Sequence, residues 1–159
     1  MQKYIGTKLI NAKPMTRLAY NELRGWTVPA DENGADEGYL VEYIDGGQAN
    51  HPDFAGYISW SPADVFDRAY RAIDGMTFGQ AIEAMKHEHY VARAGWNGKG
   101  LRLALVGKGG CLEHGFSEVS TLPYIVIIYP NDAKTTPGAI VPWLASQTDM
   151  LAEDWTIVE

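Results

Sequence analysis

The chain contains little of what several classes of protein require. Cys111 is the single cysteine among 159 residues, which excludes an intrachain disulfide and a cysteine-rich structural zinc site. No apolar run approaches the ~20 residues that span a bilayer, and no apolar segment typical of an export signal follows Met1. From these absences we expect a soluble protein of a reducing compartment, in the cytoplasm.

Positive charge is also scarce. The chain carries 13 Lys and Arg against 20 Asp and Glu, for a net charge of −7. Residues 1–75 hold 7 basic and 11 acidic residues, and residues 76–159 hold 6 and 9, so neither half has the clustered cations of a nucleic-acid surface. We expect no nucleic-acid or membrane partner. A small nucleotide is compatible with this charge, because one pocket needs only one or two cations and some backbone N–H groups.

What the sequence does contain is typical of a folded α+β protein. Apolar residues make up 46% of the chain and charged residues 21%, and five residues are Trp, so the chain can bury a core. We expect two small antiparallel sheets, each with one main helix, in two modules without a long linker. The expected modules are residues 1–75 and residues 76–159.

In the first module, residue patterns predict three strands and two helices. Thr16 is placed to cap the first helix and Gly25 to end it in a left-handed conformation. Ser61 and Pro62 are placed to cap and to begin the second helix. Residues 31–38 have no apolar anchor and predict an exposed, mobile loop. The expected strands are 4–12, which Pro14 ends, 39–44 and 56–60, and the expected helices are 17–23 and 62–74.

In the second module, Thr77 and Gln80 have the spacing of a capping box at the start of a helix that reaches about Lys86. Two strand-like runs flank a glycine-rich turn around Trp96, as in a hairpin. Residues 124–129 are mostly β-branched and predict a central strand covered on both faces. The other expected strands are 90–93, 101–106, 140–143 and 155–158, the last at an edge, and residues 107–123 are expected to be irregular.

The glycine-rich turn carries candidate ligand-binding residues. Trp96 is suited to stack on a purine, although it is also suited to cover the hairpin. Asn97 and Gly98 offer an amide and a close backbone approach, although Asn-Gly is also a common tight turn. Arg93 and Lys99 are candidate phosphate contacts, Arg93 more so because Arg grips phosphate bidentately. The alternative for both cations is an ordinary solvated charge.

A second candidate wall precedes a predicted helical turn. Ser146, Gln147, Thr148 and Asp149 place side-chain oxygens beside free backbone N–H groups, and Asp149 is suited to accept from ribose hydroxyls. On sequence alone, a helix N-cap cluster is the stronger interpretation. Phe78 is expected to face the core and to reach the ligand from the first turn of its helix.

The remaining reactive residues do not predict catalysis, a cofactor or a metal. No nucleophile-elbow sequence places a Ser with a base, and the loop at Lys108 lacks the spacing and the hydroxyl of a phosphate loop. Trp143 and Trp155 are expected in the core or at a subunit interface. The possible metal ligands lack the spacing of catalytic zinc motifs; they are His87, His89, His114 and Cys111.

Four segments of the second module together resemble the second family of Thoeris anti-defence proteins. They are residues 76–81, 91–100, 123–125 and 141–155. These phage proteins sequester the cyclic ADP-ribose-type signal, glycocyclic ADP-ribose, that bacterial TIR immune enzymes make. The resemblance implies a non-enzymatic sponge in the cytoplasm of the infected host. It also implies a homotetramer with ligand pockets between subunits, and the site residues named above.

The first module resembles a widespread small phage domain of unknown role, in residues 4–8, 14–17, 24–26 and 57–62. It is expected to be an accessory module. The residue types leave three alternatives open for the whole chain. These are a sponge for the cyclic di- or trinucleotides of CBASS defence, a nucleotide-hydrolysing enzyme with the same pocket, and a phage structural module whose Trp residues contact only protein.

Overall fold

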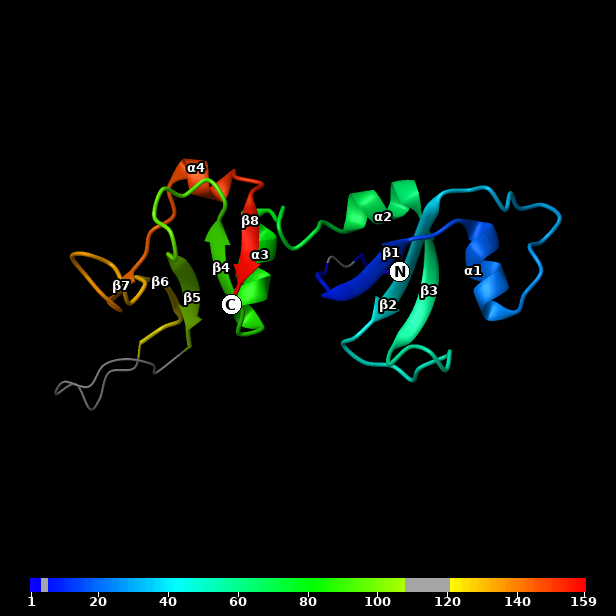
Figure 1. The fold of residues 1–159 in the computed structure, drawn as a ribbon, viewed down its shortest axis with the longest axis horizontal. Helices are drawn as coiled ribbons and strands as arrows, with labels where there is room; N and C mark the ends of the chain where they lie inside the picture. The colour runs from blue at the N-terminus through cyan, green and yellow to red at the C-terminus, as the bar shows by residue number, and fades with distance from the viewer. Residues whose placement is uncertain (4–5, 108–120) are drawn as a thin grey trace. The chain divides into compact units, whose positions relative to one another are not determined.

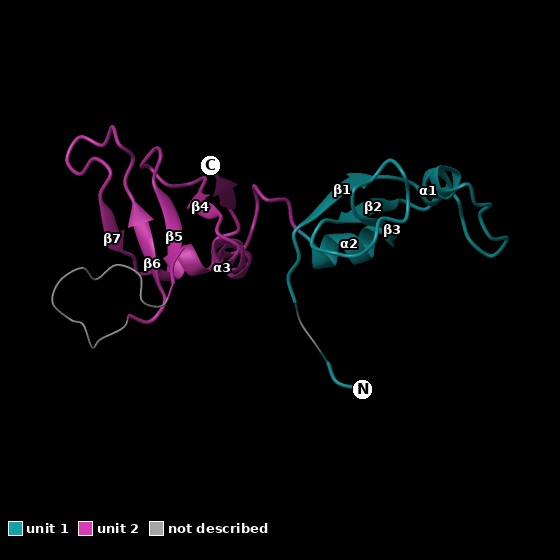
Figure 2. Cartoon of the chain, turned by 90° about the horizontal axis from the view of Figure 1, so that it is seen from below, with its two compact units in different colours: residues 1–70 teal, residues 71–159 magenta. Residues whose placement is uncertain are grey.

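The computed structural model describes residues 1–3, 6–107 and 121–159. The chain forms two compact units, Met1–Tyr70 and Arg71–Glu159 (Figures 1 and 2). Each unit contains one antiparallel sheet and few helices, which confirms the predicted α+β class. Within the described ranges, no helix is long and apolar enough to cross a membrane. The predicted roles of Lys108, Cys111 and His114 lie outside the described residues.

The first unit is a three-stranded sheet with two short helices (Figure 1). The strands lie in the order β1-β2-β3, and all neighbours are antiparallel. Tyr20 of the first helix packs with Leu40 and Ile58 of the sheet to form a small core. The elements are β1 (Ile10–Pro14), α1 (Arg17–Arg24), β2 (Gly38–Tyr43), β3 (Tyr57–Pro62) and α2 (Ala63–Ala69).

The predicted first strand was misplaced. It begins at Ile10 rather than residue 4, and it includes Pro14, which pairs with Tyr39 of β2. β1 is an edge strand, so the missing N–H of Pro14 costs no hydrogen bond within the sheet. The capped first helix is confirmed. The Thr16 side chain accepts from the N–H of Ala19, and Gly25 ends the helix at φ 68°.

The predicted start and length of the second helix are wrong. Ser61 does not cap it, because Ser61 and Pro62 belong to β3 and pair with β2. The helix begins at Ala63 without a side-chain cap and ends at Ala69, because Tyr70 is extended. No residue of α2 is buried; instead Phe66 stacks on Tyr39 with ring centroids 3.9 Å apart.

The loop expected to lack an anchor is tied to α1. Arg17 Nη1 lies 2.7 Å from Glu32, and Arg17 Nε lies 3.3 Å from Asp36. The backbone N–H of Leu18 also donates to the Gly34 carbonyl at 2.9 Å. The absence of apolar residues therefore did not mean the absence of contacts, because one arginine of the helix holds two acids of the loop.

The second unit is a five-stranded antiparallel sheet in the order β7-β6-β5-β4-β8, with α3 packed against β4, β5 and β8 (Figures 1 and 2). The expected hairpin around Trp96 and the expected last strand are confirmed. The elements of the second unit are α3 (Phe78–Lys86), β4 (Tyr90–Arg93), β5 (Arg102–Val106), β6 (Tyr124–Ile128), β7 (Ile140–Pro142), α4 (Gln147–Met150) and β8 (Trp155–Val158).

The core of this unit lies under α3. β6 has a strand on each side, as expected. Val126 is buried, and Ile125 and Ile127, which point to the opposite face of the strand, pack partly buried against the core. α3 covers β4, β5 and β8. The buried residues are Met76, Ala81, Met85, Val91, Leu103 and Trp155.

The capping box at the start of α3 is confirmed and gives the first prediction. The N–H of Gln80 donates to Thr77 Oγ1 at 3.3 Å, and the N–H of Thr77 donates to Gln80 Oε1 at 3.0 Å. We expect Thr77→Ala to lower the free energy of unfolding of this unit by ~1 kcal/mol. This change can be measured by urea denaturation, with unfolding monitored by the near-UV circular dichroism of the Trp residues. Thr77→Ser keeps the hydroxyl and should unfold as the native protein does; an equal loss in both variants would contradict the capping role.

Candidate ligand-binding site

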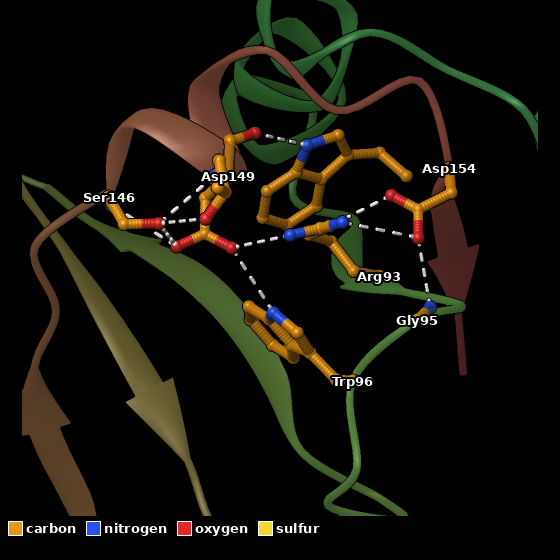
Figure 3. A network of polar contacts seen from close by, with 8 residues as sticks. Arg93, Gly95, Trp96, Ser146, Asp149 and Asp154 are labelled. Atoms are coloured by element: carbon orange, nitrogen blue, oxygen red, sulfur yellow. Dashed lines mark hydrogen bonds and ion pairs between the residues drawn. The ribbon is translucent and has the colours of Figure 1, made fainter.

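Arg93, the last residue of β4, joins two acids that lie 56 and 61 positions later in the sequence (Figure 3). Its Nη1 donates to Asp149 Oδ1 at 2.9 Å, and its Nε donates to Asp154 Oδ1 at 2.8 Å. The Arg93 side chain is only 19% exposed, so these bonds are partly shielded from water. The hydrogen bonds that Arg93 donates to Asp154, and then to Asp149, raise its pKa and outweigh the opposing effect of burial. The guanidinium is thus engaged by two carboxylates.

Asp149 connects the arginine to the glycine-rich turn and to α4. Its Oδ1 also accepts from Trp96 Nε1 at 3.3 Å, while its Oδ2 accepts from the Ser146 N–H at 3.1 Å and the Ser146 hydroxyl at 2.6 Å. Burial raises the pKa of Asp149, but the hydrogen bonds from Ser146, Arg93 and Trp96 outweigh it and lower the pKa to about 2. Asp149 is therefore ionised at neutral pH and already receives four donors.

Asp154 fixes the start of the turn. Its Oδ2 accepts from the Gly95 N–H at 2.9 Å. A Cβ at Gly95 would lie 2.9 Å from that same oxygen, so a larger residue there would push the Asp154 carboxylate away. The hydrogen bond from Arg93, opposed by burial and supported by Gly95, lowers the pKa of Asp154.

Four aromatic rings form the apolar side of the site. Trp155 is fully buried, as expected of a core residue, and its Nε1 donates to the Asp149 carbonyl at 3.0 Å. Trp96 packs edge-on against Trp155, with centroids 5.6 Å apart, and tilts against Trp143 at 6.1 Å. Phe78 of α3 lies 5.3 Å from Trp155. Such contacts stabilise by about 0.5 to 1.5 kcal/mol per pair, so Trp96 is held by packing as well as by Asp149.

The structure brings most of the predicted residues into one region. Arg93, Trp96, Ser146 and Asp149 share one hydrogen-bond network (Figure 3). Around it, the other predicted residues of the turn and of α4 are exposed; they are Asn97, Gly98, Lys99, Gln147 and Thr148. Phe78 is half-buried and contacts the Trp residues.

Asp154 is the site residue that sequence reasoning missed. Asp154 lies in one of the segments that resemble the family, but the sequence predicted no role for this residue. The signal available was its position directly before β8, whose first residue, Trp155, pairs with Arg93 of β4. That signal can be read only when the strand order is known, because β4 pairs with β8 although three other strands lie between them in the sequence.

The described ranges contain no group of three or more His, Cys, Asp or Glu residues placed to hold a metal. Ser146 is the hydroxyl closest to an acid in this network, and it donates to Asp149. A carboxylate with a pKa of about 2 is a weak base at neutral pH, so it is poorly suited to activate that hydroxyl as a nucleophile. The arrangement is a corner of packed aromatic rings and hydrogen-bonding groups.

Comparison with known proteins identifies the class of this unit. Residues 76–158 match the family model of the Thoeris anti-defense 2-like domain, and the chain belongs to that family. A curated relative, Thoeris anti-defense 2 of Bacillus phage SP01, is 40% identical over 89 residues, which cover 52% of this chain and 94% of the relative. The resemblance described from the sequence is confirmed. All the predicted site residues lie within the matched residues, and the family supports a phage function against Thoeris defence.

The depressed pKa of Asp149 gives the second prediction. Its folded-state pKa of about 2 lies below the ordinary 3.8, so the ionised group stabilises the fold above about pH 4, and this contribution is lost as the pH falls toward 2. We expect Asp149→Asn to lower the free energy of unfolding by at most about 2 kcal/mol near neutral pH. The difference from the native protein should shrink on acidification, as measured by urea denaturation across pH.

The matched control is Asp132→Asn, at an exposed residue of the same unit. Its stability should track the native protein across the same pH range. A pH-independent loss in Asp149→Asn, or an equally large pH dependence in the control, would show that the network around Asp149 does not stabilise its charge.

Proposed function

We propose that residues 71–159 bind a cyclic ADP-ribose-type immune signal, such as glycocyclic ADP-ribose, and sequester it without cleaving it. Membership of the Thoeris anti-defense 2-like family supports this function. The observation that carries it is the corner formed by Trp96 and Asp149, joined at 3.3 Å, inside the residues that match the family. Sequestration lowers the free concentration of the signal below what a host effector needs.

The groups at this corner suggest which part of the ligand each residue would contact. The accessible part of Trp96 would stack on the purine, a contact of about 1 to 3 kcal/mol. Asn97 and Thr148 are exposed and offer an amide and a hydroxyl group to the base edge and the riboses. Ser146 is exposed as well, but its hydroxyl already donates to Asp149. Nanomolar affinity is ~12 kcal/mol, so several such contacts must act together.

Two of the predicted contacts acquire a different role in this proposal. Arg93 is engaged by two carboxylates, and Asp149 already receives four donors. We therefore assign them to positioning: Arg93 holds the acids, and Asp149 holds Trp96 and Ser146. Lys99 is exposed in the turn and carries the positive charge better placed to reach a phosphate.

We further propose that this unit assembles into a homotetramer whose subunits together enclose the ligand. Large apolar side chains stand exposed beside the site: Leu144 is 92% exposed and Leu151 is 78% exposed, on either side of α4. Exposed apolar residues gathered at one place favour a protein interface. A second subunit placed there would exclude water from the Trp96 corner and so strengthen its polar contacts.

The third prediction tests binding and cleavage together. Titrating the purified protein with glycocyclic ADP-ribose by calorimetry should give tight binding, and heat denaturation should release the ligand unchanged on chromatography. Trp96→Ala should weaken binding by about ten- to a hundredfold because the stacking surface is lost. Lys99→Gln, at an exposed residue, should weaken binding and reduce its dependence on salt.

Trp26→Ala is the matched control, since it removes an exposed Trp outside the residues that match the family. It should bind as the native protein does. Recovery of altered ligand would make the protein an enzyme. Binding of cyclic di- or trinucleotides alone would replace the ADP-ribose signal in the proposal, and no binding of any nucleotide would refute it.

The fourth prediction concerns assembly. Sedimentation of the native protein should give the mass of four chains of 17.5 kDa each. Leu144→Glu should shift the protein to smaller species, because burying an unpaired charge in an interface is costly. Val65→Glu changes an exposed apolar residue of α2 in the first unit and should leave the mass unchanged. A monomeric native protein, or equal changes in both variants, would contradict the proposed interface.

A further inference from the structure

The first unit contains a pocket that the proposed function does not use. It has a volume of about 440 Å³ and is lined by α1, the connection between α1 and β2, and β3. Tyr20, Trp26 and Trp60 form much of its wall, with Pro29 and Glu32 from the connection. The volume falls within the range of about 300 to 1,000 Å³ typical of ligand sites.

The aromatic side chains of this pocket form a corner. The rings of Tyr20 and Trp26 meet at 77° with centroids 6.3 Å apart, and Trp26 is 53% exposed. Arg24 lies 4.4 Å over the Trp26 ring, and Arg17 lies 4.3 Å over the Trp60 ring. These cation–π contacts hold the rings in place. Aromatic rings held in this way offer apolar surface to the saturated pyrrolidine ring of proline.

The charge around the pocket favours a cationic partner. Arg17 of the lining is paired with Glu32 at 2.7 Å and with Asp36 at 3.3 Å. Arg24, just outside the lining, lies over the Trp26 ring. The connection also carries Asp31 and Glu37, both exposed, and residues 31–37 contain no Lys or Arg. A phosphate would therefore meet repulsion here, whereas Arg or Lys of a partner would be attracted.

We propose that this pocket binds an extended, proline-containing segment of a partner protein with Arg or Lys beside the prolines. Aromatic-lined grooves bind such segments because the polyproline II conformation is preformed and loses little entropy on binding. Proline rings occupy the corner of Tyr20, Trp26 and Trp60, and the flanking cation lies against residues 31–37. The first unit would thereby recruit a protein while the second unit binds its small ligand.

The experiment titrates the full chain with the synthetic peptide Arg-Pro-Pro-Leu-Pro-Pro-Arg and follows indole N–H signals by ¹H–¹⁵N NMR. The signals of Trp26 and Trp60 should shift, while those of Trp96, Trp143 and Trp155 stay in place. Trp26→Ala should weaken binding about thirtyfold, the loss typical of an interface hot-spot residue. Glu32→Gln should weaken it less and reduce the effect of salt.

Tyr57→Ala, at an exposed aromatic of β3 outside the pocket, should bind the peptide as the native chain does. Arg-Ala-Ala-Leu-Ala-Ala-Arg and Glu-Pro-Pro-Leu-Pro-Pro-Glu should each bind at least tenfold more weakly, which separates the contributions of proline and charge. Equal binding of the alanine peptide would overturn the proposal. So would shifts confined to the second unit, or a preference of the pocket for guanosine monophosphate over the peptide.

Discussion

The second unit depends on one cation that satisfies two separate carboxylates. Arg93 donates to Asp149, which lies within α4, and to Asp154, which directly precedes β8. Without a guanidinium between them, two ionised acids would face each other in a partly shielded place, where like charges repel strongly. A lysine has the charge but lacks the planar fork that donates in two directions at once. The geometry of the turn and of α4 therefore follows from this one side chain.

The aromatic cluster and the ionic network support each other. Trp155 is buried in the core and donates to the Asp149 carbonyl, while Trp96 contacts both the Trp155 ring and the Asp149 carboxylate. Trp96 and Trp155 are thus joined both by direct ring contact and through their separate hydrogen bonds to Asp149. The ring contacts and the hydrogen bonds therefore both hold Trp96 and Asp149 in place, in a unit whose core contains few residues.

Local features of the fold could be predicted from the sequence, and features set by distant contacts could not. Thr77 with Gln80, and Thr16 with Gly25, act over a few residues, so their caps were visible in the sequence. Ser61 looks like an equally good cap, but pairing of β3 with β2 overrides it. Arg93 could be named as a candidate from the sequence, but its two partners are set by the order of the strands, which periodicity does not reveal.

The single turn of α4 has a consequence for how the unit opens. Four residues are far too few for a helix to persist alone, because nucleation is unfavourable. The turn is stabilised because Asp149 closes its capping box, and the same carboxylate accepts from Trp96 in the turn between β4 and β5. Helix and hairpin turn must therefore fray together, as one local unfolding unit. A molecule bound between them would slow amide exchange in both segments, although they lie some fifty residues apart in the chain.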